Sequence, residues 1–428
     1  MKFISTKGKS DPVTFSEALR SGLASDGGLY VAQSLPQFST HEMLACENLI
    51  DFAKLILKPF LAGDILDNKL DLIVKDAFNF PVPLKYLKNK TAVLEIFHGP
   101  TCAFKDVGAR FLAGCASHLK DSNAKETVLV ATSGDTGGAV ASAFYKMANL
   151  QVIILYPKNR ISQRQEKQLN AWGENIKSFA VKGTFDDCQR LVKQILTSSK
   201  WKNNKFVSAN SINIGRLLPQ TTYYAKASIQ YQKQYGAPAG FIVPTGNLGN
   251  AVAAVMAMKM GFPIREIVLA TNENHAIADY FSSGVWQAQP TIATLANAMD
   301  VGSPNNMERL QYFFSDFKEM KENISTVLVT DNDISETIKS GLKNWGEVWC
   351  PHTATAVKAR EIKGSNDWVV VSTAHPAKFE TIVEPLIGQK VDVPDSLAWL
   401  LKRPSQVIEL EPTIDALEVI LKQTCFSA

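Results

Sequence analysis

Residues 128–147 read VLVATSGDTGGAVASAFYKM, a pattern typical of an α/β fold with a parallel sheet. The apolar run at 128–131 predicts a buried strand, and the run at 139–147 predicts a helix. Between them, SGDTGG at 133–138 predicts a loop, because glycines permit a sharp backbone turn. Open parallel sheets bind ligands at the carboxyl ends of their strands, so this loop is a candidate binding site.

The same alternation of short apolar runs and amphipathic segments continues through most of the chain. We expect further strands at 152–156, 176–181, 241–243, 267–270 and 369–371, and a helix that includes 165–169. A second helix is predicted from one apolar face made by Phe185, Cys188, Leu191, Val192 and Ile195. Residues 1–90 differ, because prolines punctuate them and only modest helices are expected, at 15–23 and 49–57.

The composition excludes several classes of protein. Of the 428 residues, 46% are hydrophobic and 20% are charged, so a large buried core is expected. Lys and Arg number 45 against 41 Asp and Glu, a surplus too small to indicate a nucleic-acid or membrane-surface partner. No apolar run is long enough for a membrane span or a signal peptide, so we expect a cytoplasmic protein with neither kind of partner.

The cysteines indicate neither a disulfide framework nor a metal site. They form no C-x-x-C pair, and no close Cys/His cluster has the spacing of zinc ligands. We therefore expect free, mostly buried thiols and no metal ion. The six are Cys46, Cys102, Cys115, Cys188, Cys350 and Cys425.

Lys105 stands in an unusual setting, HGPTCAFKD at 98–106. Apolar residues repeat downstream at helical spacing, so Lys105 is expected to begin a helix that packs into the core. The positive end of the helix dipole and partial burial would both favour a neutral, nucleophilic amine. The alternative, a lysine that extends its ammonium into solvent, stays open from this segment alone.

Two more segments follow predicted strands. PTGNLGN at 244–250 lacks the glycine spacing of a dinucleotide fold and the lysine of an ATP-binding loop, so a compact phosphate cup of backbone N–H groups is the better prediction. STAHP at 372–376 follows the strand at 369–371. An ordinary turn remains an alternative for 244–250, a strand-to-helix turn capped by Ser or Thr for 132–138, and a packed or surface role for His375.

Taken together and in this order, the segments resemble the threonine synthases, pyridoxal-phosphate enzymes of fold type II related to tryptophan synthase β and cysteine synthase. Further matching segments are SDGGLYV at 25–31, SANSINIGRLLPQ at 208–220, NAMDVGSPNNMERL at 297–310 and STAHPAKF at 372–379. The resemblance covers nearly the whole chain. It implies two α/β domains with parallel sheets and an N-terminal extension. Residues 1–90 would form the N-terminal domain, and 91–428 the catalytic region, with the cofactor between two α/β subdomains.

The resemblance implies a role for each matching residue. Lys105 would bind the aldehyde of pyridoxal 5′-phosphate covalently and act as the catalytic amine. The other cofactor-binding residues would be Asp135, Thr245, Gly246, Asn247, Leu248, Gly249, Asn250 and Thr373. The substrate-binding residues would be Ser133, Thr136, Asn210, Ser211, Asn213 and Arg216.

Within these sets, the loop at 245–250 would hold the cofactor phosphate and Thr373 would meet the pyridine nitrogen. Asp135 would lie beside the 3′-oxygen, where many relatives have Asn, so which partner carries the shared hydrogen stays open. The loop at 133–136 would take the substrate carboxylate. Residues 210–216 would grip a phosphate, because the planar fork of Arg216 suits phosphate oxygens, although turn and capping roles stay open for their polar side chains.

The implied reaction converts O-phospho-L-homoserine and water to L-threonine and phosphate, the last step of threonine biosynthesis. Two alternatives stay open: a lyase that releases 2-oxobutyrate and ammonia, and a non-catalytic ligand-binding relative. An NAD-dependent dehydrogenase is disfavoured, because the chain has no G-x-G-x-x-G after a first strand. The sequence leaves monomer and homodimer equally open.

Overall fold

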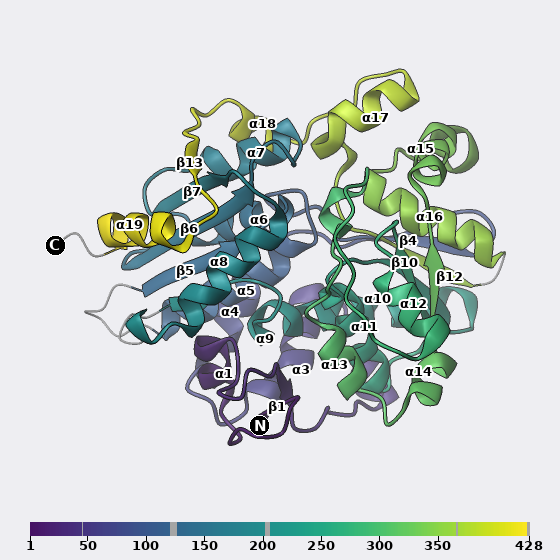
Figure 1. The fold of residues 1–428 in the computed structure, drawn as a ribbon. Helices are drawn as coiled ribbons and strands as arrows, with labels where there is room; N and C mark the ends of the chain where they lie inside the picture. The colour runs from purple at the N-terminus through teal and green to yellow at the C-terminus, as the bar shows by residue number, and fades with distance from the viewer. Residues whose placement is uncertain (45, 120–125, 202–205, 365–366, 426–428) are drawn as a thin grey trace.

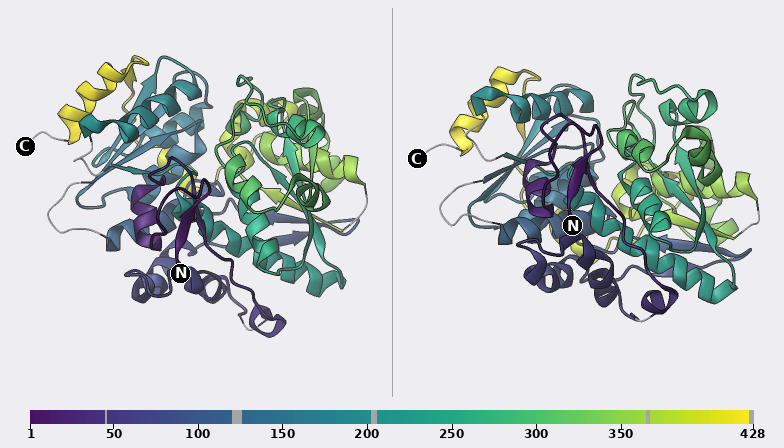
Figure 2. Two further views of the ribbon diagram at one scale, coloured as in Figure 1. Left: turned by 60° about the horizontal axis from the view of Figure 1, so that its bottom comes forward. Right: turned by 90° about the horizontal axis from the view of Figure 1, so that it is seen from below.

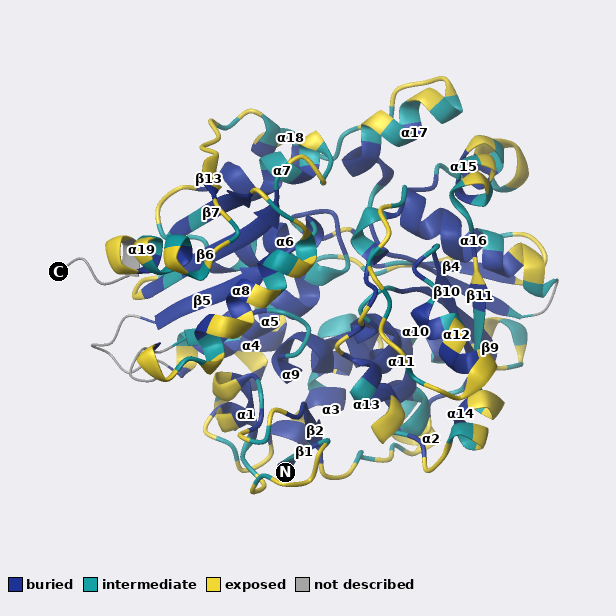
Figure 3. Ribbon diagram, in the orientation of Figure 1, coloured by how far each residue is buried: buried dark blue, intermediate teal, exposed yellow. Residues whose placement is uncertain are grey.

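The computed structural model describes residues 1–44, 46–119, 126–201, 206–364 and 367–425, and it contains two α/β lobes with a smaller N-terminal part (Figure 1). Each lobe is built on a mostly parallel sheet with helices on its faces. The predicted fold class is therefore confirmed. The strands in the middle of each sheet are buried, and many of the exposed residues lie on outer helices such as α15 (Asp331–Trp345) and α19 (Ile414–Cys425) (Figure 3).

One lobe holds a six-stranded sheet in the order β11-β10-β9-β12-β4-β3. All neighbouring pairs are parallel except β3 with β4. The strands β9 and β12 are buried along their whole length, because helices cover both faces of a parallel sheet. The strands are β3 Leu84–Tyr86, β4 Thr91–Glu95, β9 Ala239–Pro244, β10 Ile264–Thr271, β11 Ile324–Leu328 and β12 Trp368–Ser372. The helices that follow them include α10 Thr221–Tyr235, α11 Gly249–Lys259, α12 Ala276–Ser283, α13 Met307–Tyr312, α14 Phe317–Asn323, α15 Asp331–Trp345, α16 Pro351–Lys363 and α17 Glu380–Ile387.

The other lobe holds a fully parallel five-stranded sheet in the order β13-β7-β6-β5-β8. Its strands are β5 Glu126–Ala131, β6 Leu150–Pro157, β7 Ile176–Val181, β8 Phe206–Ser208 and β13 Ile408–Leu410. Its helices are α5 Lys105–His118, α6 Asp135–Phe144, α7 Gln163–Asn170, α8 Phe185–Thr197, α9 Ile214–Leu217, α18 Asp395–Leu401 and α19 Ile414–Cys425. The chain leaves the six-stranded sheet after β4, returns to it at β9 and ends with β13 in the five-stranded sheet, so the two lobes are interleaved in sequence.

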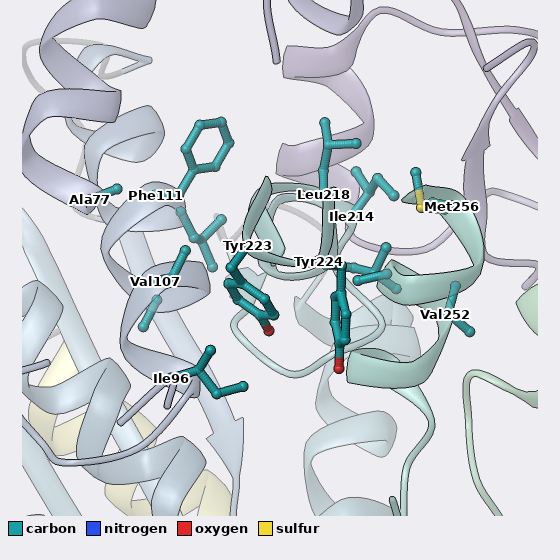
Figure 4. Close-up of a cluster of buried hydrophobic side chains, with 14 of the residues drawn as sticks. Ala77, Ile96, Val107, Phe111, Ile214, Leu218, Tyr223, Tyr224, Val252 and Met256 are labelled. Atoms are coloured by element: carbon teal, nitrogen blue, oxygen red, sulfur yellow. The ribbon is translucent and has the colours of Figure 1, made fainter. Parts of the chain in front are cut away.

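The N-terminal part packs beneath both lobes (Figure 2). It contains an antiparallel pair of short strands, β1 Phe3–Ser5 and β2 Tyr30–Ala32, and its helices are α1 Phe15–Ser21, α2 Thr40–Leu44, α3 Leu49–Leu61 and α4 Leu70–Ala77. Helix α4 packs on α5, and α3 packs on α10. Figure 4 shows the buried cluster where these elements meet, with Ala77 of α4, Phe111 of α5, and Tyr223 and Tyr224 of α10.

The N-terminal ends of α5 and α10 are thereby fixed by one continuous core.

The strand β3 precedes the predicted domain boundary at residue 90, yet it pairs with β4 of the six-stranded sheet.

Most predicted elements are confirmed, often with longer bounds, but the predicted start of the helix at 139–147 is wrong. Helix α6 begins at Asp135 and ends at Phe144, so the second half of the predicted glycine loop is its first turn. The hydroxyl of Thr132 accepts hydrogen bonds from the N–H groups of Gly134 and Gly137, at 3.0 and 2.9 Å, and organises that turn. Because glycine has a low helix propensity, the two glycines of this turn led to the prediction of a loop.

The two glycines of that turn differ in the space around them. A Cβ on Gly137 would lie 2.6 Å from Thr132 Cγ2 and 2.7 Å from Leu169 Cδ2, whereas one on Gly138 would have its nearest contact at 3.4 Å. We expect Gly137→Ala to lower the free energy of unfolding by about 1–3 kcal/mol. The matched variant Gly138→Ala is expected to be neutral or up to about 1 kcal/mol more stable, because alanine favours helix. Equal effects in chemical denaturation would contradict this packing.

The described cysteines fit the prediction of free thiols. Cys102, Cys115, Cys188 and Cys350 are buried and Cys46 is partly exposed, while the side chain of Cys425 lies outside the described residues. In the part of the chain that the structure describes, no three His, Cys, Asp or Glu side chains are grouped to hold a metal ion. None of its described helices has both the length and the apolarity to cross a bilayer.

Candidate active site

A pocket between the lobes collects residues from all four predicted segments. The carboxyl ends of β5, β9 and β12 and the N-terminus of α5 all open into it. We call it the central pocket. The predicted site residues that line it are Lys105, Ser133, Asp135, Thr136, Asn210, Ser211, Arg216, Thr245, Gly246, Asn247, Leu248, Gly249, Asn250 and Thr373. Of the predicted set, only Asn213 is absent from its lining.

Lys105 is the first residue of α5, as predicted, and its side chain lines the central pocket. Its Nζ lies 5.4 Å from the ring centroid of Phe104. Burial lowers the pKa of Lys105 to about 8, with Lys378 and Arg216 acting in the same direction and Asp135 opposing them. At neutral pH a useful fraction of this amine is therefore unprotonated, which a nucleophile or a general base requires.

The loop before Lys105 is held rigidly by Asp106. Its buried carboxylate accepts the backbone N–H of Thr101 at 2.9 Å and the hydroxyl of the same residue at 2.6 Å. Gly99 lies so close that a Cβ there would be 2.5 Å from Asp106 Oδ2. On the other side, the N–H of Phe104 donates to the carbonyl of Thr373 at 2.9 Å. These contacts fix the direction in which Lys105 leaves the helix.

The N-terminus of α6 offers an anion site at one end of the pocket. Gly134 precedes the helix with φ 129° and has no side chain to cap it, and among the described contacts Thr132 takes only the N–H of Gly137 in the first turn. Ser133 and Thr136 line the pocket beside it. Uncapped backbone N–H groups with adjacent hydroxyls fit a carboxylate.

Asp135, in the same turn, is held by two buried side chains that the sequence reasoning missed. Its Oδ1 accepts from Gln165 Nε2 at 3.0 Å and lies 2.7 Å from Lys378 Nζ. Burial alone would raise the pKa of Asp135, but Lys378 and Lys105 hold it well below its usual range. The motif STAHPAKF contained Lys378, but no pattern in the sequence indicated that it would reach Asp135.

The loop after β9 forms a second anion site. Leu248 adopts a left-handed conformation with φ 61°, and α11 begins at Gly249 with no side-chain cap. A Cβ on Gly246 would lie 2.6 Å from the carbonyl oxygen of Met299, so the loop is packed too tightly for a larger residue. The Nδ2 of Asn250 is buried and has no hydrogen-bond partner among the described residues. Free donors around a cup of this kind fit the phosphate of the expected cofactor.

Arg216 supplies a third cluster of donors. Its side chain is buried in the pocket wall, where one terminal nitrogen donates to the carbonyl of Ala209, and Nε meets no acceptor in the part of the chain that the structure describes. Burial lowers the pKa of Arg216 to about 10, against the opposing influence of Asp106, so it stays cationic at neutral pH. A buried cation with an unused N–H can donate a hydrogen bond to an oxygen of a phosphate group.

The polar neighbours of Arg216 are not equivalent. Ser211 Oγ accepts a hydrogen bond from Asn247 Nδ2 at 2.9 Å. Asn210 accepts a hydrogen bond from the N–H of Ala131 and donates one to its carbonyl, and it also lines the central pocket. Asn213 instead caps α9, with Oδ1 accepting from Gly215 N–H.

The amide nitrogen of Asn213 donates to the carbonyls of Leu19 and Ser208, at 2.8 and 3.0 Å. Its side chain is thus fully used away from the pocket. We therefore correct the expected substrate set by leaving Asn213 out, and the capping alternative accounts for it.

His352 is another pocket residue without a sequence signal. Its Nε2 accepts the N–H of Ala298 at 3.1 Å, which places the ring hydrogen on Nδ1. Burial lowers the pKa of His352 to about 4, so the ring is neutral. Because Ala298 and Met299 back the Gly246 loop, His352 supports the second anion site.

Arg309 braces the loop that carries Ser211. This fully buried side chain donates to the carbonyls of Tyr30, Ser211 and Ile212, at 3.0, 3.0 and 2.7 Å, and to Asn306 Oδ1 at 2.8 Å. It therefore links the N-terminal part to the wall of the pocket.

We expect Arg309→Met to lower the free energy of unfolding by about 3 kcal/mol, because three buried carbonyl groups would lose their donor. Arg309→Lys is expected to rescue little, since one ammonium cannot reach all of these acceptors. The exposed Arg160→Met is the control and should be neutral. An Arg309→Met protein as stable as this control in urea denaturation would contradict the bracing role.

Three family models match the chain in succession. Residues 2–78 match "Threonine synthase N terminus", residues 82–374 match "Pyridoxal-phosphate dependent enzyme" and residues 352–420 match "Threonine synthase, C-terminal". The threonine synthase of Haemophilus influenzae is 39% identical over 400 residues, which cover 93% of this chain and 94% of that protein.

Solved structures agree with these matches. The crystal structure of threonine synthase from Escherichia coli superposes with a TM-score of 0.92 at 37% identity, covering 99% of this chain and 100% of that one. A pyridoxal-phosphate-bound threonine synthase from Brucella melitensis gives a TM-score of 0.90 at 32% identity, with 100% of each chain covered.

Proposed function

The chain belongs to the threonine synthase family of pyridoxal-phosphate-dependent enzymes, and from this premise we propose that it converts O-phospho-L-homoserine and water to L-threonine and phosphate. One observation supports this most directly: the amine of Lys105 shares a pocket with two buried, unpartnered donors, Asn250 Nδ2 and Arg216 Nε. One donor set suits the phosphate of the cofactor and the other suits the phosphate of the substrate.

The residues of the pocket fit the cofactor. Lys105 would hold its aldehyde, the loop of residues 245–250 its phosphate, and Thr373 its pyridine nitrogen. When bound, pyridoxal phosphate supplies the electron sink for carbanion chemistry. The hydroxyl of Thr373 cannot keep a pyridine nitrogen protonated as a carboxylate would, so this chain favours a weaker sink and fewer side reactions.

Lys105 is the proposed proton carrier. Its Nζ takes the proton from the α carbon of the substrate and returns a proton at a later step. A pKa of about 8 suits both directions of transfer near neutral pH. The rigid Thr101–Asp106 turn keeps the amine directed into the pocket while it acts.

The substrate is held at both ends. The N-terminus of α6, with Ser133 and Thr136, binds the carboxylate, and Arg216 with Ser211 binds the phosphate. Fixing both charged ends orients the reacting carbons against Lys105. Such orientation is the main contribution that a protein makes to a reaction carried by a cofactor. Asn210 joins this set through its place in the lining.

The test is a product assay with O-phospho-L-homoserine, with and without added pyridoxal phosphate. Formation of L-threonine and phosphate in equal amounts is the expected result. Accumulation of 2-oxobutyrate and ammonia would instead favour the lyase alternative, because the same residues can start that reaction. No turnover at all by a cofactor-loaded protein would favour the ligand-binding relative. The cytoplasmic location and the choice between monomer and homodimer stay predictions.

A further inference from the structure

Lys378 is a buried charge that none of the proposed roles uses. It lies in the short 3₁₀ segment Pro376–Phe379 after β12, and its side chain has no exposed surface. Its Nζ lies 2.7 Å from Asp135 Oδ1 and donates to the carbonyl of Thr101 at 2.9 Å. Removing an ammonium from water costs several kcal/mol unless it is paired and hydrogen-bonded, so a specific partner has to account for it.

The pair is fixed on both sides by α7. Gln165 Nε2 donates to the same oxygen of Asp135 at 3.0 Å, and Gln168 Nε2 donates to the same carbonyl of Thr101 at 3.0 Å. Within the described part of the chain, both hydrogen bonds to the Asp135 carboxylate end on Oδ1, so Oδ2 is left for a ligand of the central pocket. The pair is therefore rigid and borders the site directly.

We propose that Lys378 is a positioning residue for the proposed reaction: its buried ammonium keeps Asp135 a carboxylate anion, held in one orientation in the wall of the central pocket. An ionised carboxylate can only accept hydrogen bonds, whereas a neutral carboxylic acid can donate one. The ligand atom that meets Asp135 must then bring the hydrogen. This answers the question that the sequence left open at this position, and it rests on the proposed function.

The other charged and titratable groups around the pair support this role. Asp135 is faced by Lys105 of α5, by the neutral His352 of α16 and by the buried thiols of Cys102 and Cys350. Lys378 is faced by Asp106. Of the two lysines that face Asp135, Lys105 must lose and regain its proton during the proposed reaction. Lys378 is therefore the cation that can balance Asp135 throughout the cycle.

The first test measures the thermal stability of the full chain, with saturating pyridoxal phosphate and after its removal, in a double-mutant cycle. Lys378→Met is expected to lower Tm by roughly 5 °C or more, because it leaves a buried carboxylate uncompensated. The double variant Lys378→Met with Asp135→Asn is expected to recover most of that loss. Lys390→Met is the matched control and should change Tm by less than about 1 °C, since the Lys390 side chain is 93% exposed in its pair with Glu384.

If Lys378→Met does not fold while the double variant does, the two charges are coupled as proposed. Equal losses of Tm in the single and double variants, or failure of both to fold, would overturn the proposal.

The pH dependence of Tm is the second readout. In the wild type, the pKa of Asp135 is depressed in the folded state, so its stabilisation is present above about pH 4 and is lost as the pH falls further. In Lys378→Met, burial dominates and raises the folded-state pKa of Asp135. Its contribution is then present at low pH and lost as the pH rises, so Tm should fall as the pH rises above about 4. The double variant should lack this fall. Its absence from Lys378→Met as well would overturn the proposal.

The third readout is the visible absorption band of the bound cofactor. Lys378→Met should gain a pH-dependent change of this band that the wild type and the double variant both lack, and kcat should fall roughly tenfold or more while KM changes little. An unchanged band and kcat would overturn the positioning role. A wild-type protein that forms no threonine would refute the proposed function instead, and the Tm cycle would still report on the ion pair.

Discussion

Lys105→Ala is expected to reduce the rate of threonine formation by roughly 10²- to 10⁴-fold, the contribution of a well-placed general base. Lys105 begins α5, lines the central pocket and has a pKa lowered to about 8. The variant should also fail to retain the cofactor after borohydride reduction and denaturation, because the amine that the reduction would fix is gone. Activity and absorbance of the reduced, unfolded protein measure the two effects.

Lys339→Ala is the control for this experiment, because that lysine lies on the exposed face of α15. It should keep full activity and the covalently fixed cofactor. If Lys105→Ala still carried the cofactor after reduction and unfolding, a different lysine would be the point of attachment.

Arg216→Ala is expected to lower kcat/KM for O-phospho-L-homoserine by roughly 10²- to 10³-fold, or about 3–4 kcal/mol, mainly through KM. The side chain is buried in the pocket with a free Nε, so its removal takes away a desolvated cation at the proposed phosphate site. The affinity for pyridoxal phosphate should change little, because the cofactor phosphate is assigned to the loop at 245–250. Inhibition by inorganic phosphate should weaken in parallel.

Arg216→Lys should recover only part of the loss, since an ammonium cannot reproduce the planar fork of the guanidinium. The exposed Arg160→Ala should behave like the wild type. An unchanged KM in Arg216→Ala, with normal stability, would remove Arg216 from the phosphate site.

The loops of the pocket could be predicted because each follows a strand of strong local signal. Apolar runs bounded by Gly, Ser and Pro marked β5, β9 and β12, and the rule for parallel sheets placed their loops at one edge. Strands of three residues such as β1, β3, β8 and β13 gave no such signal, because two alternations do not define a period.

Which polar side chain faces the pocket was harder to predict than which segment forms it. Asn210 and Asn213 belong to one motif, yet Asn210 lines the pocket and Asn213 caps α9. Both roles use an amide in the same way, and only the path of the backbone decides between them.

Buried charges were the largest omission. Lys378 and Arg309 make their hydrogen bonds to groups far away in sequence, Asp135 and Tyr30 among them. No local sequence pattern therefore predicts that these two side chains are buried. A single sequence records that such a residue is charged, but its burial depends on how the lobes meet.

The position of β12 in its sheet has a consequence for biogenesis. This strand comes from residues 368–372 yet lies between β9 and β4, so a growing chain cannot fill the middle of that sheet until nearly all of it has been translated. At ordinary elongation rates a nascent molecule carries these open strand edges for tens of seconds. Until β12 emerges, those edges can pair with other chains, so we expect aggregation of incomplete chains to limit the yield of the protein more than the stability of the finished fold does.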